Sequence, residues 1–388
     1  MGTHPAGRLE DVWNAAWGAV FRRRGWRPVI VPYQGYGRSG DEGFVRVLAR
    51  VLLVPGQEPR VSHTASPRAS VGARARSLRD WSVREWSARA PSGRAGAAVR
   101  TAPPGLPDRR GWRAFFTLPA AHAPVMVTVS GVEHQVRADR SGIVDARLPG
   151  PEVTPGWKQV TLHIDLPDEH TADAVTARVF VVAPEQSFGL VSDIDDTVIR
   201  TLLPRPLLAA YNTFVLRETS RSPVPGMAEL YRTLLARHSG APTVYVSTGA
   251  WNTAAMLRRF LARHGYPEGP MLLTDWGPTN TGWFRSGPDH KRACLHALAA
   301  DLPSVRWVLV GDDGQHDPSL YAEFARERPD RVRVIAIRQL TVTEQMLAHG
   351  TATQRIGEHY GPARSVVPEV RAPDGVSLAA ALTGLDVS

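Results

Sequence analysis

The residues with the clearest chemical potential are three aspartates, Asp193, Asp195 and Asp196, which directly follow the apolar stretch 188–192. Residues two apart on an extended chain project to the same side, so Asp193 and Asp195 can face one site. Carboxylates gathered at the end of a buried strand repel one another unless a cation or a proton relieves the charge. Aspartate-rich turns are also ordinary solvated loops, but such a loop does not need a core strand before it. The pattern therefore predicts a site with carboxylate or cation chemistry.

Polar residues end two later apolar stretches as well. Ser247 and Thr248 close the stretch 243–247, and Gly249 follows them, a combination suited to holding phosphate oxygens. Serine and threonine often end strands, so this group is weak by itself. The apolar stretch 307–311 runs into the letters GDDGQHD, which form a second acidic loop.

Lysine is scarce in this chain, which carries nearly all its basic charge on arginine. The two lysines are Lys158 and Lys291, and Lys291 opens a predicted helix. An ammonium group beside free helix amides can bind a phosphate, although a single lysine in such a position is usually a surface residue. Together with the first aspartate motif, the serine and the second acidic loop, Lys291 completes a specific four-part pattern.

This four-part pattern resembles the haloacid dehalogenase superfamily. Within it, residues 188–340 are similar to the phosphatidate phosphatases of the yeast actin-patch type and their bacterial relatives, and more distantly to the lipin catalytic core. The similarity rests on SDIDDTV (192–198), YVS (245–247), Trp251-Asn252, LLTDWG (272–277), Asp289-His290-Lys291, GQHDP (314–318) and Ile335-Ala-Ile-Arg338, with YQGYG (33–37) further upstream. The chain departs from the pattern at Gly249-Ala250, where a Ser-Pro-like pair is usual, and at Asp313, where a small polar residue is usual.

The resemblance implies that Asp193 attacks phosphorus and forms an aspartyl-phosphate. It implies that Asp195 protonates the leaving alkoxide and later deprotonates the hydrolytic water. Mg²⁺ is then held by Asp193, the main-chain carbonyl of Asp195 and Asp312, with Asp317 orienting its waters. Either Asp312 or Asp313 can be the direct ligand, and we expect Asp312 because it comes first after the strand.

The remaining roles also follow from the resemblance. Lys291 is implied to act in catalysis, because it and Ser247 would hold phosphate oxygens and balance the charge that shifts in the transition state. Thr197 is expected to shape the nucleophile loop. Thr248 and Asn252 are expected to bind substrate together with Thr197 and Ser247.

Strands alternating with helices predict the fold that positions these residues. Between residues 185 and 360, four buried strands are expected at 188–194, 243–247, 307–311 and 332–337, with helices at 227–237, 254–263, 291–300 and 318–326. This alternation predicts an α/β doubly wound parallel sheet with the site at the carboxyl ends of its strands, which the resemblance identifies as haloacid dehalogenase-like. The two longest connections are too short for an independent cap domain, so a minimal cap and an open site are expected, which suit a bulky or membrane-embedded substrate.

The preceding region, 27–184, has many short β-branched segments separated by turns, which predicts an all-β, sandwich-like domain. Residues 56–111 interrupt it with arginine, alanine, proline, serine and glycine, and are expected to be a disordered insertion with one short helix at 78–86. Its arginines are either a solvated face or phosphate contacts. Residues 361–388 contain proline and glycine and are expected to form a flexible tail.

The N-terminal residues 1–26 are expected to form an amphipathic helix, with an apolar face over 9–21 and three arginines at 22–24. Two interpretations stay open. The helix packs on its own domain with arginines at its C-terminal dipole, or it lies on a membrane with its arginines on anionic lipid.

The composition limits the class of protein. The chain has 388 residues, 43% of them hydrophobic, which argues against wholesale disorder. A net charge of +9 indicates an acidic partner, but no nucleic-acid-binding motif is present, so nucleic acid is not expected. Cys294 is the single cysteine, and neither a secretory signal nor an apolar run of membrane-spanning length is seen. We therefore expect a cytoplasmic protein. Peripheral attachment to the inner face of the membrane is compatible with this location.

The sequence thus favours a magnesium-dependent phosphatase that hydrolyses phosphatidic acid to diacylglycerol and phosphate. The alternatives are a phosphatase of another phospholipid or a soluble phosphomonoester, and a non-catalytic lipid-binding module. The presence of both Asp193 and Asp195 argues against the last, because a pure binder has no need of an acid–base carboxylate.

Overall fold

A computed structural model describes residues 25–55, 118–150, 152–165, 174–200, 221–274, 287–314, 316–349 and 367–385. The chain divides into two compact units, which have most of their contacts within themselves. One unit consists of residues 1–55 and 105–388, and the other of residues 56–104. The predicted helix at 9–21 and the predicted insertion at 56–111 lie outside the described residues.

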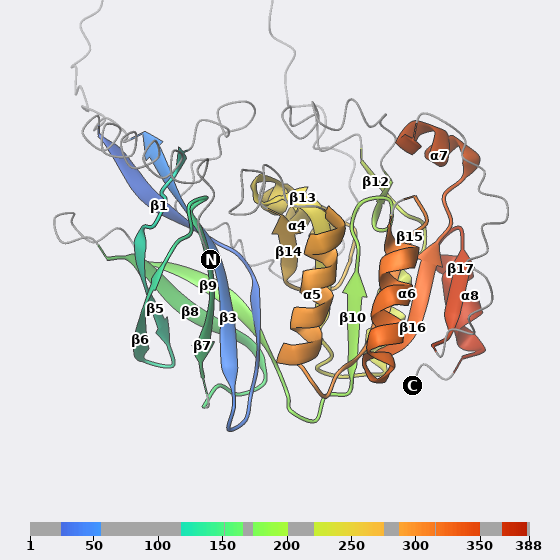
Figure 1. Cartoon of the computed structure of the whole chain (residues 1–388), viewed down its shortest axis with the longest axis horizontal. Helices are drawn as coiled ribbons and strands as arrows, with labels where there is room; N and C mark the ends of the chain where they lie inside the picture. The colour runs from blue at the N-terminus through green and yellow to red at the C-terminus, as the bar shows by residue number, and fades with distance from the viewer. Residues whose placement is uncertain are drawn as a thin grey trace, which may run out of the picture. The chain divides into compact units, whose positions relative to one another are not determined.

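The N-terminal β-region consists of strands joined by turns (Figure 1). Alternate side chains of these strands face a core. In β5, for example, Val125, Val127 and Val129 are buried while the residues between them are half-exposed. The described strands are β1 (Trp26–Pro32), β2 (Gly35–Arg38), β3 (Phe44–Pro55), β4 (Leu118–Pro119), β5 (Pro124–Val129), β6 (Val132–Arg137), β7 (Ile143–Pro149), β8 (Gly156–Ile164) and β9 (Val175–Val182).

Hydrogen bonds join these nine strands into one sheet of order β1-β3-β2-β9-β8-β5-β6, with β4 and β7 also paired to β3. The sandwich-like packing expected here stays a prediction, whereas the joining of all nine strands into one hydrogen-bonded sheet is a finding. The physical reason is the length of β3: its residues 49–55 pair with β1, while residues 44–50 pair with β7 and residues 44–46 also with β2. Strand β2, which contains part of the YQGYG segment, was not among the expected strands.

The C-terminal region contains a six-stranded sheet whose neighbouring strands are all parallel. All five residues of the central strand β10 are buried, as expected for a strand covered on both faces. The order is β14 (Met271–Thr274), β13 (Thr243–Ala250), β10 (Phe188–Ser192), β15 (Arg306–Asp312), β16 (Val332–Arg338) and β17 (Glu369–Ala372). A separate pair joins β11 (Ile199–Arg200) to β12 (Ser222–Pro223).

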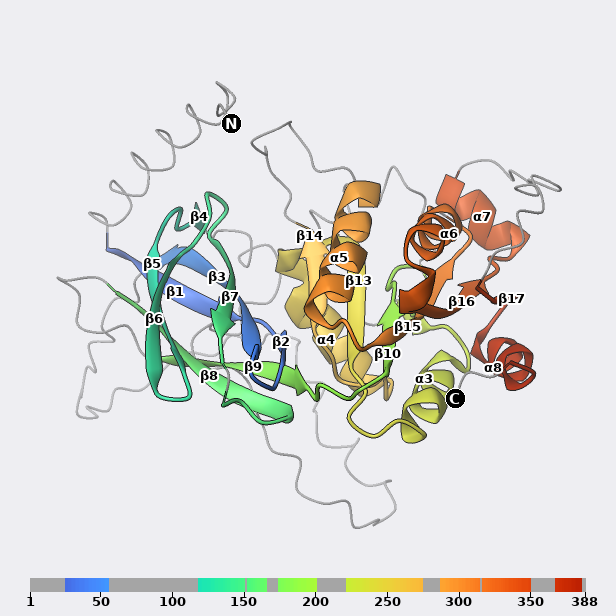
Figure 2. The same cartoon turned by 60° about the horizontal axis from the view of Figure 1, so that its bottom comes forward.

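Helices lie on both faces of the parallel sheet (Figure 2). Helices α5 and α6 lie together on one face, and α3 lies with α8 on the other. The described helices are α3 (Met227–Ala236), α4 (Ala254–Arg263), α5 (Gly287–Asp301), α6 (Asp317–Glu327), α7 (Val342–His349) and α8 (Gly375–Thr383), with short 3₁₀ turns η3 (Trp251–Thr253) and η4 (Pro329–Arg331). None of the helices in the described ranges is long and apolar enough to cross a membrane.

The expected flexible tail at 361–388 needs correction. Residues 369–372 form β17 on the edge of the parallel sheet, and α8 follows it. The carboxylate of Asp374 caps α8 by accepting a hydrogen bond from the Ser377 amide at 2.8 Å. Leu378 and Leu382 are buried, so the apolar face of a short helix orders a segment whose proline and glycine content suggested a tail.

Candidate active site

The parallel strands bring the predicted residues to one edge of the sheet. Ser192 at the end of β10 lies opposite Tyr245 of β13 on one side and Val310 of β15 on the other. Asp193 follows Ser192 directly, and Ser247 and Asp312 lie two residues beyond Tyr245 and Val310, so all three come to the same edge of the sheet. This is the edge at which α/β sheets usually bind their ligands.

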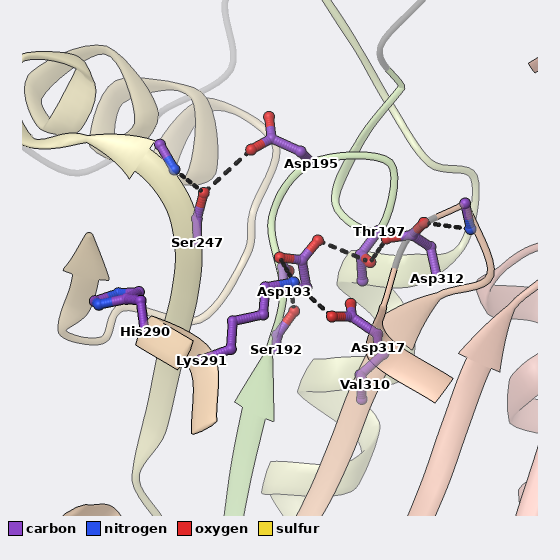
Figure 3. Close-up of polar contacts among 12 residues, drawn as sticks. Ser192, Asp193, Asp195, Thr197, Ser247, His290, Lys291, Val310, Asp312 and Asp317 are labelled. Atoms are coloured by element: carbon purple, nitrogen blue, oxygen red, sulfur yellow. Dashed lines mark hydrogen bonds and ion pairs between the residues drawn. The ribbon is translucent and has the colours of Figure 1, made fainter. Parts of the chain in front are cut away.

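Lys291 is the cation at the centre of the site (Figure 3). Its Nζ lies 2.6 Å from Oδ1 of Asp193 and 2.5 Å from Oδ1 of Asp317, and all three side chains are buried. The neighbouring His290 points away from the aspartates, with its Nε2 3.2 Å from the carbonyl oxygen of Leu272. Helix α5 thus directs Lys291 to the carboxylates and the preceding His290 to β14.

Thr197 connects the two acidic loops. Its hydroxyl is 3.3 Å from Oδ2 of Asp193 and 3.3 Å from Oδ2 of Asp312, and the side chain is fully buried. The other oxygen of Asp312 accepts a hydrogen bond from the Gly314 amide at 2.7 Å. The expectation that Thr197 shapes the nucleophile loop agrees with this position, while its contact with a substrate stays a prediction.

Asp193, Asp312 and Asp317 can together hold a metal ion. One carboxylate oxygen from each lies within 4.8 Å of the others, and all three residues are buried. Oδ2 of Asp317 is buried without a hydrogen-bond partner in the described part of the chain. Buried carboxylate oxygens with unused acceptor capacity fit a hard cation such as Mg²⁺. The side chain of Asp195 is not a member of this cluster, so its expected role as a main-chain ligand stays a prediction.

Asp313 faces away from this cluster. Its Oδ1 accepts a hydrogen bond from the Leu340 amide at 2.8 Å, and its own amide donates to the Arg338 carbonyl at 3.0 Å. The carboxylate is thus engaged in holding the end of β16. Of the two alternatives left open by the sequence, the geometry favours Asp312 as the metal ligand.

Burial and the neighbouring charges shift the pKa values of three groups in the cluster. Burial raises the pKa of Asp193, partly opposed by Lys291, and burial together with Asp317 and Asp193 raises the pKa of Asp312. Burial disfavours a charged lysine, but the surrounding carboxylates outweigh it and raise the pKa of Lys291. A bound divalent cation would favour the ionised carboxylates.

Asp195 lies on the other side of the turn, beside the end of β13. Its Oδ2 accepts a hydrogen bond from Ser247 Oγ at 3.1 Å, and Ser247 Oγ accepts one from the Gly249 amide at 2.9 Å. Asp195 is half-buried, so it can meet both Ser247 and an entering molecule. Thr248 is half-buried and Asn252 is exposed in η3, so their substrate contacts stay predictions.

The sequence patterns did not indicate a role for Thr274 at the site. Its Oγ1 donates to the carbonyl of Thr248 at 2.7 Å, at the point where the pairing of β13 with β14 shifts register. Thr274 therefore supports the end of β13, which carries Ser247 and Thr248. The available signal was its position: it is the polar residue that ends the apolar strand β14, just as Asp193 follows β10.

Comparisons with known proteins point to one class of phosphatase. Residues 188–339, less than half of the chain, match the family described as "Phosphatidate phosphatase APP1, catalytic domain". This segment contains every predicted site residue. The predicted resemblance to phosphatidate phosphatases is therefore confirmed for it, whereas membership of the haloacid dehalogenase superfamily stays a prediction.

Two fungal proteins show the same similarity. Phosphatidate phosphatase APP1 of Saccharomyces cerevisiae is 27% identical over 185 residues, which cover 46% of this chain and 31% of that protein. An uncharacterized protein of Schizosaccharomyces pombe is 25% identical over 160 residues, covering 41% of this chain and 26% of that protein. The chain thus matches less than a third of the length of either relative.

Among solved structures, a β-glucuronidase of Parabacteroides merdae aligns with 80% of this chain and 33% of its own, at 10% identity and a TM-score of 0.24. That likeness is too low to bear on fold or function.

Proposed function

We propose that this chain is a magnesium-dependent phosphatidate phosphatase, which hydrolyses phosphatidic acid to diacylglycerol and phosphate. The observation that carries the proposal is the buried cluster of Asp193, Lys291, Asp312 and Asp317. It lies within the segment that matches the catalytic domain of phosphatidate phosphatases.

In the first half-reaction, a carboxylate oxygen of Asp193 forms a bond to phosphorus while the bond from phosphorus to the diacylglycerol oxygen breaks. Asp195 gives its proton to the departing oxygen. The hydrogen bond from Ser247 holds the Asp195 carboxyl near the end of β13. The product of this step is an aspartyl-phosphate on Asp193.

In the second half-reaction, water attacks the phosphorus of the aspartyl-phosphate and the bond between phosphorus and the Asp193 oxygen breaks. Asp195, now ionised, accepts the proton of the attacking water. Free phosphate leaves, and both aspartates return to their starting states.

Mg²⁺ would be held by Asp193, Asp312 and Asp317 together with the main-chain carbonyl of Asp195, and when bound it would supply positive charge next to the phosphoryl oxygens. Lys291 adds a fixed positive charge beside Asp193. When substrate binds, Ser247 would turn its single hydroxyl hydrogen from Asp195 to a phosphate oxygen, with Thr197, Thr248 and Asn252 completing the contacts.

The partner implied by this activity is a phospholipid in a membrane, reached by peripheral association of a basic protein with an anionic surface. The alternative substrates are another phospholipid monoester or a soluble phosphomonoester, with the same mechanism. The remaining alternative is a lipid-binding module without turnover.

The test is phosphate release from phosphatidate, lysophosphatidate, phosphatidylglycerophosphate and a soluble phosphomonoester, each with Mg²⁺ and with chelator. We expect phosphatidate in mixed micelles or vesicles to be the preferred substrate and chelator to abolish release. Preference for a different phosphomonoester would replace the substrate and keep the mechanism. Binding of phosphatidate without release from any substrate would leave the lipid-binding module.

A further inference from the structure

The turn that carries Asp193 and Asp195 has an unusual backbone conformation at Asp196. Asp196 has a φ of +57°, in the left-handed region that few side chains other than Asn and Asp adopt readily. Hydrogen bonds close the turn from within: the amides of Val198 and Ile199 donate to the Ile194 carbonyl at 2.9 and 3.0 Å, and the Asp196 amide donates to the Ile199 carbonyl at 2.8 Å.

A guanidinium group from another strand binds the main chain at Asp196. Nη1 of Arg338 donates to the main-chain carbonyl of Asp196 at 2.6 Å. Arg338 is the last residue of β16 and is only 2% exposed. Its other nitrogens donate to Glu344 Oε1 at 2.7 Å and to the Pro373 carbonyl at 3.2 Å. Three acceptors in three directions match the planar fork of arginine and not the single ammonium of lysine.

Glu344 extends the same network to the far end of the turn. It lies in α7, is buried, and accepts a hydrogen bond from Arg200 Nε at 2.8 Å as well as from Arg338. Arg200 belongs to β11, which ends the turn of residues 193–200. Burial alone would raise the pKa of Glu344, but hydrogen bonds from Thr341 and the two arginines lower it to about 2. The carboxylate is therefore charged at neutral pH.

Arg338 also contacts the second acidic loop through its main chain. It lies opposite Asp312 in the β15–β16 pairing, and its carbonyl accepts a hydrogen bond from the Asp313 amide at 3.0 Å. One residue thus touches both loops that supply carboxylates to the site. Stability is a weak explanation for the Arg338–Glu344 pair, because a buried ion pair often stabilises a fold no more than apolar residues of the same size.

We propose that Arg338 and Glu344 are positioning residues, which hold the turn of residues 193–200 so that Asp193 and Asp195 point into the site. They act through the Asp196 carbonyl and Arg200. The inference rests on the proposed function and deepens it. A displacement of a reacting group by about 1 Å can cost a factor of about 10² in rate, so loss of this hold is expected to lower kcat more than substrate affinity.

The test compares Arg338→Lys and Glu344→Gln with wild type and with Leu378→Ala. Leu378 is fully buried in α8, the helix that follows the Arg338 acceptor Pro373. Its truncation therefore destabilises a neighbouring part of the fold and removes none of the hydrogen bonds to the turn of residues 193–200. Each protein is measured for Tm, for kcat and KM of phosphate release from phosphatidate with Mg²⁺, and for amide hydrogen exchange in peptides covering 193–200 and 243–250.

We expect both polar variants to lower kcat at least about tenfold with KM changed less than about twofold. Exchange should become faster at the Val198 and Ile199 amides and stay unchanged over 243–250. Leu378→Ala should lower Tm while keeping kcat and the protection of the turn. If Arg338→Lys does not fold, the kcat and the exchange rates of Glu344→Gln, which preserves the size of the side chain, decide the test.

Wild-type kcat and wild-type exchange in the polar variants would overturn the inference. So would an equal loss of kcat in Leu378→Ala, because the effect would then follow from stability alone. If the wild-type protein releases phosphate from no substrate, the proposed function fails, and the exchange rates of the turn still decide whether Arg338 and Glu344 hold it.

Discussion

Lys291 sets the charge balance of the site. With Asp193, Asp312 and Asp317 ionised, three negative charges face one positive charge, which leaves a net charge of two negatives in a buried space. Such an imbalance is costly in a medium of low dielectric constant. A divalent cation would offset it, which is why we place Mg²⁺ among these carboxylates rather than at the surface.

The nucleophile and the acid are tested by Asp193→Asn and Asp195→Asn. Both substitutions keep the size of the side chain and remove the attacking oxygen or the transferable proton. We expect turnover to fall below detection while the circular dichroism spectrum is unchanged. More than a few per cent of wild-type phosphate release in Asp193→Asn, with deamidation excluded by mass spectrometry, contradicts the covalent mechanism.

The choice of metal ligand is tested by comparing Asp312→Ala with Asp313→Ala. Asp312 belongs to the cluster with Asp193 and Asp317, whereas the carboxylate of Asp313 accepts a hydrogen bond from the Leu340 amide. We expect Asp312→Ala to raise the Mg²⁺ concentration required for half-maximal activity far more than Asp313→Ala does. Mg²⁺ titration of both variants decides the point, and a larger shift in Asp313→Ala reverses the assignment.

At the scale of elements, α6 packs unusually close to β15 because Gly311 has no side chain. A Cβ added at this position would lie 2.5 Å from Oδ2 of Asp317 and 2.8 Å from Cε2 of Tyr321. Asp317 is the first residue of α6, where the helix dipole favours a carboxylate. The glycine thus lets one helix bring its first carboxylate to the end of the neighbouring strand.

Gly311→Ala should therefore damage the site and the fold together. We expect a loss of about 1–3 kcal/mol in the free energy of unfolding from overpacking, and a weaker response to Mg²⁺ because Asp317 is displaced. Denaturant unfolding and Mg²⁺ titration measure the two effects. The matched control is Gly384→Ala, where an added Cβ meets no atom within 4 Å. Equal behaviour of the two variants would show that the close approach of α6 is unimportant.

At the scale of the whole molecule, the β-region contributes directly to the core of the catalytic region. Tyr36 and Phe44 belong to the same hydrophobic cluster as Phe188 and Leu190 of β10. The hydroxyl of Tyr36 also donates to Asp301 at the end of α5, at 2.7 Å. We infer that the β-region stabilises the sheet that carries the site.

Membrane association is tested by deleting residues 1–24. Their sequence places tryptophans on one helical face beside three arginines, and each basic residue near an anionic surface contributes about 1 kcal/mol of attraction. We expect the deletion to lower phosphate release from phosphatidate in anionic vesicles and to spare a soluble phosphomonoester. Vesicle sedimentation at low and high salt, run beside both assays, follows binding itself. Equal loss on both substrates with unchanged sedimentation would dispose of membrane anchoring.

The sequence by itself predicted the main strands and helices of the region 185–360 and the residues that we propose for its site. Apolar stretches of strand length predicted β10, β13, β15 and β16 because a strand buried on both faces needs apolar residues at every position. Polar residues placed directly after such strands predicted where the proposed site lies, because parallel strands end at one edge of a sheet.

Only the tertiary structure showed that Asp312 lies with Asp193 and Asp317 while Asp313 accepts a hydrogen bond from the Leu340 amide, because adjacent side chains leave a strand end in different directions. It also gave Arg338 its proposed positioning role, which depends on a carbonyl 142 residues away along the chain, at Asp196. The joining of the β-strands into one sheet depends likewise on the long-range partners of β3. Local patterns record which residues are buried, but the partner of a buried polar group or of a strand edge is set by the packing of distant segments.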